Sequence, residues 1–395
     1  MSNHIANRLN SQLKTRLPKL SVSKNLKLIF FSCFVFAFGD GLFTYLLPVY
    51  LNQLNASPTD VGMLYAVYYL SLGITPLLGG LLADRFDNRK IIIAGSLLWI
   101  PVPLALAIAT NWTQLWLPMI LYGTFFGSTS ICIFIIRSTP PEKTMQTFGL
   151  WSASVAFGYV FSPMIGGAIA ATIGKQPVFL LAACLYITSV LPLIFINKLP
   201  KAEPKIQTAP TAHKFSDFKK LIILCGFFSL IIFAISLINP LISQYMHEVY
   251  NQNVFNLGVF GATTSFGWIF FSFTIGKIGD KYSKMSAMLS SIAVCVLSFS
   301  LIATINNVPL LFFASFLSGA SRCMFGLVWA ITGSAAPQGY TGRWISISQA
   351  SIHLVSFGAP IIGGILYEIS PYLAFVTTIL LLASLALLAT FKRRL

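Results

Sequence analysis

The chain has 395 residues, of which 56% are hydrophobic and only 9% are charged. A water-soluble domain carries about 25% charged residues, so this composition excludes an ordinary soluble protein and indicates an integral membrane protein. The formal net charge of +16 would suit nucleic-acid binding in a soluble chain, but the positions of the basic residues exclude that function here.

The first 26 residues form a basic N-terminal tail. Ile5, Leu9, Leu13 and Leu17 recur at every fourth position, and the basic residues lie off that stripe. This pattern predicts a short amphipathic helix lying on anionic membrane lipid, and a solvated tail without a role is the alternative. We do not expect a signal peptide, because the apolar run that follows is too long and lacks a convincing cleavage site.

Twelve apolar stretches follow, and each is long enough to cross the hydrocarbon core as a helix of about 20 residues. Their apolar residues are continuous rather than alternating, which predicts helices rather than the strands of a barrel. The expected spans are residues 27–50, 60–83, 89–110, 112–136, 146–172, 177–197, 220–246, 254–276, 284–305, 309–335, 343–367 and 371–391.

The basic residues alternate between the two sides of this arrangement. With the N-terminus inside, all but two of the 26 Lys and Arg residues lie in cytoplasmic tails and loops. The exceptions are Lys175 in an outer loop and Arg322 within a span. Basic residues near the ends of spans stay in the cytoplasm, so we expect both termini there, in a plasma or inner membrane. The charge therefore reflects topology and not a nucleic-acid partner.

Two motifs recur at nearly the same offset. Gly80-x-x-x-Asp84-Arg85 returns as Gly276-x-x-x-Asp280-Lys281, and Ser162-Pro163-x-x-Gly166-Gly167 returns as Ala359-Pro360-x-x-Gly363-Gly364. Two landmarks at one spacing predict a duplicated membrane domain, which is how many secondary transporters are built. The expected segments are a tail (1–26), an N-terminal bundle (27–198), a cytoplasmic linker (199–218) and a C-terminal bundle (219–395).

The sequence contains no nucleotide-binding loop and no soluble catalytic domain. We therefore expect no enzyme activity and no cofactor, and an ion gradient rather than ATP as the energy source. All six cysteines fall inside expected spans, where they serve as small core hydrophobes and not as a disulfide framework.

Over residues 27–392 the chain resembles the major facilitator superfamily of transporters. The resemblance is carried by the loop after the second span, whose residues match the family signature except that Asp87 replaces a glycine. The matching residues are Gly80, Asp84, Arg85, Arg89 and Lys90. The resemblance implies an all-α fold of twelve transmembrane helices in two pseudo-symmetric six-helix bundles.

In this family the loop latches the cytoplasmic gate, its carboxylate facing a helix start that carries roughly half a positive charge. The resemblance gives this role to Asp84, with the start of helix 11 near Arg343 as its partner. Asp280 and Lys281 occupy the matching position of the second half. A charge cluster that only sets topology is the alternative.

A second motif, in the fifth span, resembles that of the drug:proton antiporters in the superfamily. Its residues are Gly149, Gly158, Ser162, Pro163, Gly166 and Gly167. Ser162 replaces one of the family's glycines. The glycines clear a helix face for close packing and the proline permits a bend, so generic small-residue packing is the alternative. The arginine that many such antiporters carry in helix 4 is missing, since Met119 stands at that position.

Few ionisable residues lie within the spans. Asp40 is the only one of the ten acids well inside a span, and Arg322 and His353 accompany it. A charge at mid-membrane costs at least about 2.5–3.5 kcal/mol, so such groups face a cavity or pair with one another. The resemblance places helices 1, 4, 7 and 10 around a central cavity, with Asp40 and Arg322 facing it from opposite halves.

We expect Asp40 to carry the coupling proton and Arg322, which stays charged, to tune it. A static ion pair is the alternative for Asp40 and Arg322, and a packing role is the alternative for His353. Four further residues are candidates for contact with a small-molecule substrate, with helix packing as the alternative for each. They are Thr44, Asn239, Trp329 and Gln349.

These features predict a monomeric, proton-coupled antiporter that exports small organic molecules, drug-like or metabolite, by alternating access. One alternative is an importer of a nutrient or organic anion, with Arg322 as the anion clamp. A second alternative is a metal exporter in which Asp40 and His353 hold a divalent ion. This alternative is less favoured, because Arg322 would repel the ion.

Overall fold

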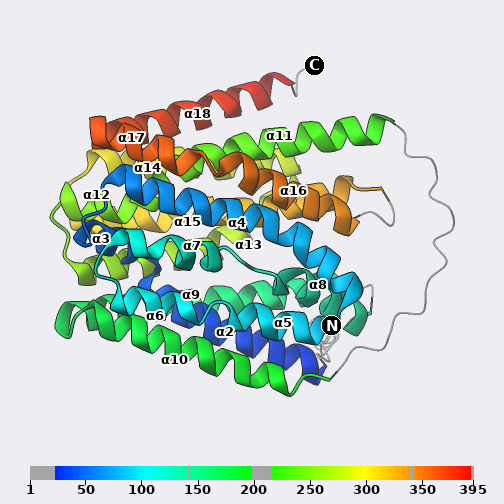
Figure 1. Ribbon diagram of the computed structural model, residues 1–395. Helices are drawn as coiled ribbons and strands as arrows, with labels where there is room; N and C mark the ends of the chain where they lie inside the picture. The colour runs from blue at the N-terminus through cyan, green and yellow to red at the C-terminus, as the bar shows by residue number, and fades with distance from the viewer. Residues whose placement is uncertain (1–22, 141–142, 198–214, 338–340, 393–395) are drawn as a thin grey trace, which may run out of the picture.

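The computed structural model describes residues 23–140, 143–197, 215–337 and 341–392, and in these ranges it consists of helices without strands (Figure 1). Twelve helices are long and apolar enough to cross a membrane. They are formed by α2 (Lys24–Thr44), α4 (Pro58–Arg85), α5 with α6 (Asn88–Leu97, Pro101–Ile108), α7 with α8 (Trp116–Tyr122, Gly127–Ser138), α9 (Thr144–Thr172), α10 (Lys175–Ile194), α11 with α12 (Phe215–Ile238, Ile242–Glu248), α13 (Val254–Lys281), α14 (Lys284–Thr304), α15 (Val308–Ala335), α16 with α17 (Thr341–Ser356, Ala359–Ile369) and α18 (Pro371–Lys392).

Several spans are interrupted where a proline follows. Proline has no N–H group and fits only the first turn of a helix, so a new helix begins at or just before it. The expected first span, 27–50, therefore ends as α2 at Thr44, and a separate helix α3 (Leu47–Gln53) begins next to Pro48. Pro76, Pro163 and Pro192 are exceptions, because α4, α9 and α10 continue through them.

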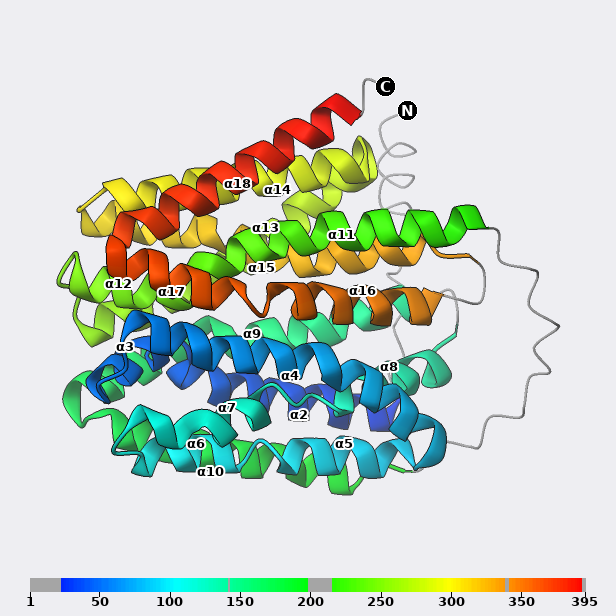
Figure 2. The same ribbon diagram turned by 45° about the horizontal axis from the view of Figure 1, so that its top comes forward.

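The helices form two bundles of six that lie side by side (Figure 2). Helices α2–α10 make up the lower bundle in this view, and α11–α18 make up the upper one. We call the end at which α2 begins and α18 finishes the terminal end, and the opposite end, where α3 and α12 lie, the far end (Figure 1). The bundles meet where α9 packs on α13 and where α4 packs on α16 and α17.

Glycines make these contacts close. A Cβ atom at Gly62 of α4 would overlap the carbonyl group of Pro360, and a Cβ atom at Gly258 of α13 would overlap that of Pro163. Gly62 and Gly258 are separated by the same offset as the repeated motifs. The two halves are therefore joined by the same glycine–proline contact, used twice.

The paired glycines of the repeated motif extend this symmetry. Gly166 packs on the backbone of Leu42 in its own bundle, and Gly363 packs in the same way on Leu237. The following residue of each pair crosses to the other bundle, because Gly167 meets Gly258 and Gly364 meets the start of α4. We call the α4–α17 and α9–α13 contacts together the far-end seal.

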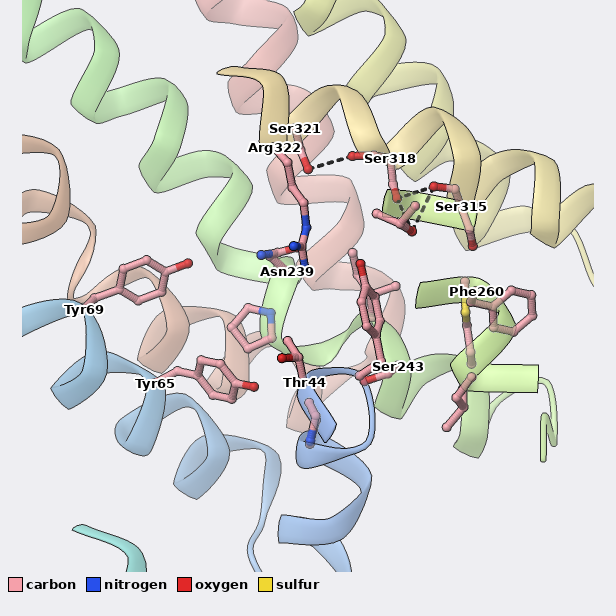
Figure 3. Close-up of a pocket in the computed structure, with 17 residues that line it drawn as sticks. Thr44, Tyr65, Tyr69, Asn239, Ser243, Phe260, Ser315, Ser318, Ser321 and Arg322 are labelled. Atoms are coloured by element: carbon pink, nitrogen blue, oxygen red, sulfur yellow. Dashed lines mark hydrogen bonds between the residues drawn. The ribbon is translucent and has the colours of Figure 1, made fainter. Parts of the chain in front are cut away.

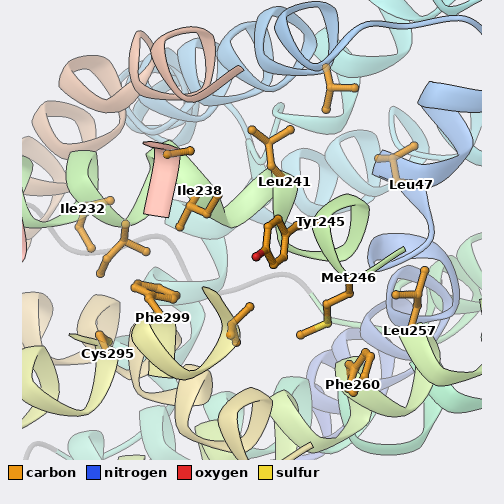
Figure 4. Close-up of a cluster of buried hydrophobic side chains, with 14 of the residues drawn as sticks. Leu47, Ile232, Ile238, Leu241, Tyr245, Met246, Leu257, Phe260, Cys295 and Phe299 are labelled. Atoms are coloured by element: carbon orange, nitrogen blue, oxygen red, sulfur yellow. The ribbon is translucent and has the colours of Figure 1, made fainter. Parts of the chain in front are cut away.

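The terminal end lacks contacts of this kind at the corresponding glycines. A Cβ atom at Gly80, Gly149 or Gly276 would have no heavy atom within 4 Å. At the far end, by contrast, a cluster of buried apolar side chains fills the space beside α12 and α3 (Figure 4). It includes Leu47, Leu241, Tyr245, Met246, Leu257 and Phe260. The structure is therefore closed at its far end.

The segment boundaries proposed from sequence remain predictions. The amphipathic helix expected in the tail lies outside the described residues, as does most of the expected linker. Helix α11 begins at Phe215, inside the range 199–218 that was expected for that linker.

Candidate functional site

A cavity lies between the two bundles and is lined from both (Figure 3). Thr44, Asn239 and Arg322, which the sequence suggested as substrate contacts, are among the described residues lining it. Asp40, Trp329, Gln349 and His353 are not. Its volume is about 90 Å³, whereas pockets that hold drug-sized ligands have about 300–1,000 Å³. The cavity must therefore widen before it can hold such a molecule.

Asp40 lies behind this cavity in a cage of hydroxyl groups. Its Oδ1 atom accepts hydrogen bonds from the hydroxyls of Tyr122 (2.6 Å) and Tyr186 (2.8 Å). Its Oδ2 atom accepts from Tyr159 (2.5 Å) and from Thr44 (3.1 Å). The side chain is only 4% exposed. Hydrogen-bond donors therefore surround both oxygens of the carboxylate.

Arg322 is held differently, by aromatic rings. The guanidinium carbon lies 5.5 Å from the ring centre of Tyr45, 5.4 Å from that of Tyr159 and 5.9 Å from that of Trp268. Each cation–π contact contributes about 0.5–2 kcal/mol. Tyr159 thus serves both charges, since its hydroxyl binds Asp40 and its ring contacts Arg322.

The two sets of contacts divide differently between the bundles. All four donors to Asp40 belong to the bundle of α2–α10, so a rigid rotation of one bundle against the other leaves the cage intact. Arg322 belongs to α15 in the other bundle, and its contacts with Tyr45 and Tyr159 cross the boundary. Such a rotation would move the guanidinium relative to Asp40.

The sequence analysis missed the three tyrosines of the cage. Tyr122, Tyr159 and Tyr186 come from three different spans, and spacing along the chain does not reveal that they converge. One chemical signal was available in the sequence. The chain has 34 phenylalanines, so a tyrosine inside a span is a departure from its usual aromatic residue, and a buried tyrosine hydroxyl needs a hydrogen-bond partner.

His353 does not line the cavity but lies directly behind it, between two aromatic rings, one of which, Tyr69, is a lining residue. Its ring stacks on Phe325 at 5.9 Å and on Tyr69 at 6.0 Å, measured between ring centres. Its Nδ1 atom is buried and has no hydrogen-bond partner among the described residues. Gln349 is half-buried on the same helix, and Trp329 is 38% exposed.

The signature loop lies at the terminal end, between α4 and α5. Asp87, the residue that replaces the family glycine, caps α5 by accepting a hydrogen bond from the Arg89 amide at 3.0 Å. The Arg89 guanidinium donates to the carbonyl oxygen of Ile194 at the end of α10. The side chains of Asp84 and Arg343 lie outside the described set, so the expected latch between them stays a prediction.

The remaining residues of that loop and its copy mark matching helix ends. Arg85 ends α4, and Lys281 ends α13 one residue after Asp280. Lys90 is exposed, and the Lys281 ammonium lies 5.2 Å from the ring centre of Tyr282.

Ser162 uses its hydroxyl within the motif of the fifth span. It is fully buried and donates to the carbonyl oxygen of Gly158 at 2.7 Å. A Cβ atom at Gly41 of α2 would overlap this hydroxyl, and a Cβ atom at Gly158 would crowd Ala37 and Phe34. The motif therefore packs α9 closely against α2, the helix that carries Asp40.

Comparison with known proteins decides the family. The sequence profile of the Major Facilitator Superfamily matches residues 29–234 and 222–395. The chain belongs to this superfamily. It is therefore an integral membrane protein that transports small molecules, and not an enzyme.

Two curated relatives and one solved structure show how far the likeness extends. Multidrug resistance protein MdtG of Proteus mirabilis (strain HI4320) is 24% identical over 357 residues, which cover 87% of this chain and 89% of that protein. Quinolone resistance protein NorA of Staphylococcus aureus (strain Mu50) is 28% identical over 202 residues, 51% of this chain and 49% of NorA. The structure of the nucleoside transporter NupG has a TM-score of 0.72 at 15% identity, covering 94% of this chain and 98% of that one.

Proposed function

We propose that the protein is a proton-coupled antiporter that exports small organic molecules by alternating access. It acts as a monomer in a plasma or inner membrane, with both termini cytoplasmic. The names of MdtG and NorA support export of drug-like molecules, because both are described as resistance proteins. The motif in α9 supports the same group of transporters.

The observation that carries the proposal is the cage around Asp40. A buried carboxylate beside a central cavity is a group that can take up and release a proton, and hydroxyl donors hold both of its oxygens in place. Movement of Arg322 changes the field at Asp40, because the two residues are joined through Tyr159 across the bundle boundary. Protonation and bundle rotation are thereby linked without covalent chemistry.

The proposed membrane orientation decides which side of the membrane the closed end faces. With the termini in the cytoplasm, the far-end seal lies on the outer side, and the structure corresponds to an inward-facing conformer. Asp84 and the start of α16 then form the latch of the opposite, outward-facing conformer.

Two alternatives use the same residues. An importer of an organic anion is favoured by Arg322, which lines the cavity. A metal exporter has less support, because no group of three His, Cys, Asp or Glu residues that could hold an ion occurs among the described residues. Asp40 is surrounded by hydroxyls and His353 by rings.

Proteoliposomes with an imposed pH gradient test the proposal. The substrate is first chosen by growth of a hypersensitive host that expresses the protein across a panel of drug-like compounds. Asp40→Asn should abolish gradient-driven transport and retain substrate binding, which then no longer depends on pH. Glu248→Gln neutralises an exposed acid at the far end and keeps an oxygen that can accept the hydrogen bond from Tyr367, so it should transport as the wild type does.

A static ion pair predicts a different result for Asp40→Asn. The variant would then be misfolded or permanently open, and any remaining transport would still respond to pH. Full proton-driven transport by Asp40→Asn would refute the assignment of Asp40 as the proton carrier.

A further inference from the structure

The charge of the cavity is carried by one residue. Arg322 is the only charged side chain among the described residues that line it, and no carboxylate accompanies it there. Asp40 does not line the cavity, and its oxygens accept hydrogen bonds from hydroxyls of its own bundle. The guanidinium is therefore the one charged group among the described lining residues that a ligand in this cavity can contact directly.

The contacts of Arg322 leave its hydrogen-bonding capacity available. A guanidinium carries five N–H donors in a fixed fork that matches the two oxygens of a carboxylate. The rings of Tyr45, Tyr159 and Trp268 contact the cation, and its N–H groups donate no hydrogen bond to another described residue. In Figure 3 the side chain extends from α15 into the cavity and ends near Asn239.

The rest of the lining suits the remainder of such a ligand. Asn239 provides an amide beside the guanidinium, and Tyr65 and Tyr69 extend from α4 with their hydroxyl ends toward the cavity (Figure 3). An oxyanion next to Arg322 would thus also lie beside the Asn239 amide. A planar body attached to it would lie against tyrosine rings.

We infer that the substrate is an organic anion, a carboxylate on a planar aromatic body, and that Arg322 pairs with the carboxylate. This inference rests on the proposed transport function and names its substrate class. A cation of the same shape is disfavoured, because it would bring two like charges together in a site of low dielectric. A neutral amide lacks the charge that the guanidinium requires.

Three probes of one shape test the inference. They are 2-naphthoate, 2-naphthamide and (2-naphthyl)methylammonium, titrated at one pH into the full-length protein in lipid nanodiscs, with binding followed by calorimetry. The naphthoate should bind about tenfold to a hundredfold more tightly than the amide, which corresponds to about 1.4–2.8 kcal/mol. The ammonium probe should bind more weakly than either.

Substitutions test whether the preference for the anionic probe depends on Arg322. Arg322→Met should bind naphthoate and naphthamide alike, and Arg322→Lys should keep part of the preference. Lys175→Met removes a positive charge that lies outside the cavity lining and should behave as the wild type. Where Arg322→Met fails to fold, the ranking of the three probes on the wild-type protein and the behaviour of Arg322→Lys still decide the question.

Equal binding of the three probes, or tighter binding of the ammonium, would overturn the inference. So would an anion preference that survives in folded Arg322→Met. These titrations use no pH gradient, so they are independent of proton coupling. Failure of gradient-driven transport with intact anion preference would remove the proposed antiport and leave the anion site.

Discussion

Tyr159 contacts both charged side chains of the proposed transport site. Its hydroxyl is one of four donors to Asp40, and its ring is one of three that hold Arg322. A phenylalanine at this position would keep the ring and lose the hydroxyl, so the two contacts can be separated by a single substitution. Hydrogen bonds to a charged group are worth about 1.5–3 kcal/mol, which is enough to alter the protonation of Asp40 measurably.

Tyr159→Phe should therefore shift the pH dependence of transport. Loss of a donor weakens the hydrogen bonding of the carboxylate, so the pH of half-maximal transport should rise. Transport into proteoliposomes across a pH series measures this shift.

The matched control is Tyr282→Phe, which removes a tyrosine hydroxyl from an exposed position at the terminal end. It should leave the pH profile unchanged. An unshifted profile in Tyr159→Phe as well would mean that the hydroxyl cage does not set the proton affinity of the site.

At the scale of elements, two helix pairs hold the far end closed by the same device. In each pair a glycine near the start of one helix receives the carbonyl group of a motif proline in the other bundle: Gly62 receives Pro360, and Gly258 receives Pro163. Without a side chain in between, the backbones approach closely and pack over a long face. A single methyl group added at either glycine should therefore push the two helices of that contact apart.

Gly258→Ala should open the far end, because its Cβ atom would overlap the Pro163 carbonyl group. Overpacking of this kind costs about 1–3 kcal/mol, so the closed population should fall about fivefold or more. Spin labels at Asn111 and Asn306, exposed positions of the two bundles at the far end, should report longer distances.

Gly276→Ala provides the control on the same helix, α13. A Cβ atom there has open space, and alanine favours a helix by about 0.5–1 kcal/mol relative to glycine. Its distance distribution should match that of the wild type. If both variants gave the same distribution, the glycine–proline contact would not hold the seal.

The helices could be predicted from sequence because length and hydropathy determine them. Twelve apolar runs gave twelve spans, with differences confined to ends and to interruptions such as those at Pro48 and Pro360. The sequence did not indicate that Pro163 lies in an unbroken helix whereas its copy Pro360 begins a new one. The small residues of the motif let α9 pack closely on α2 and α13 while the helix continues through Pro163.

The site could be predicted only in part. Asp40 and Arg322 could be singled out because burying an ionisable side chain in a membrane costs free energy. That cost follows from the position of a single residue in an apolar span, so no knowledge of its neighbours in space is needed. The tyrosine donors did not, because tyrosine is unremarkable in a span until its partner is known. Convergence of α2, α7, α9 and α10 on one carboxylate is a property of the packed bundle.

At the scale of the whole molecule, the proposed alternating-access cycle requires the two ends to open and close in turn. In that proposal the far-end seal holds one conformer, and the loop between α4 and α5 holds the other. The repeated sequence accounts for this arrangement, since each bundle supplies one glycine and one proline contact to the seal. The latch is assigned to Asp84 by the family resemblance.

Asp84→Asn should weaken the outward-facing conformer without removing the protein from the membrane. A contact between two sites of this kind is worth about 1–3 kcal/mol of coupling, so the population should change about fivefold to 150-fold. The labels at Asn111 and Asn306 should show fewer long distances, and transport should slow. Unchanged distances and unchanged transport would remove the latch role.

Asp87→Asn is the control in the same loop. It removes one negative charge but keeps an oxygen that can cap α5 at the Arg89 amide. It should leave the conformer populations unchanged, which separates a specific latch from a general effect of loop charge.

The arginine that lines the cavity has an electrical consequence. With Asp40 ionised, the two side chains cancel, so a carrier loaded with an anion has one net negative charge and a carrier loaded with a proton has one net positive charge. With one anion carried outward and one proton inward per cycle, the membrane potential drives both half-cycles, at about 2.3 kcal/mol for each charge per 100 mV. An inside-negative voltage alone would then power export, even where no pH difference exists across the membrane.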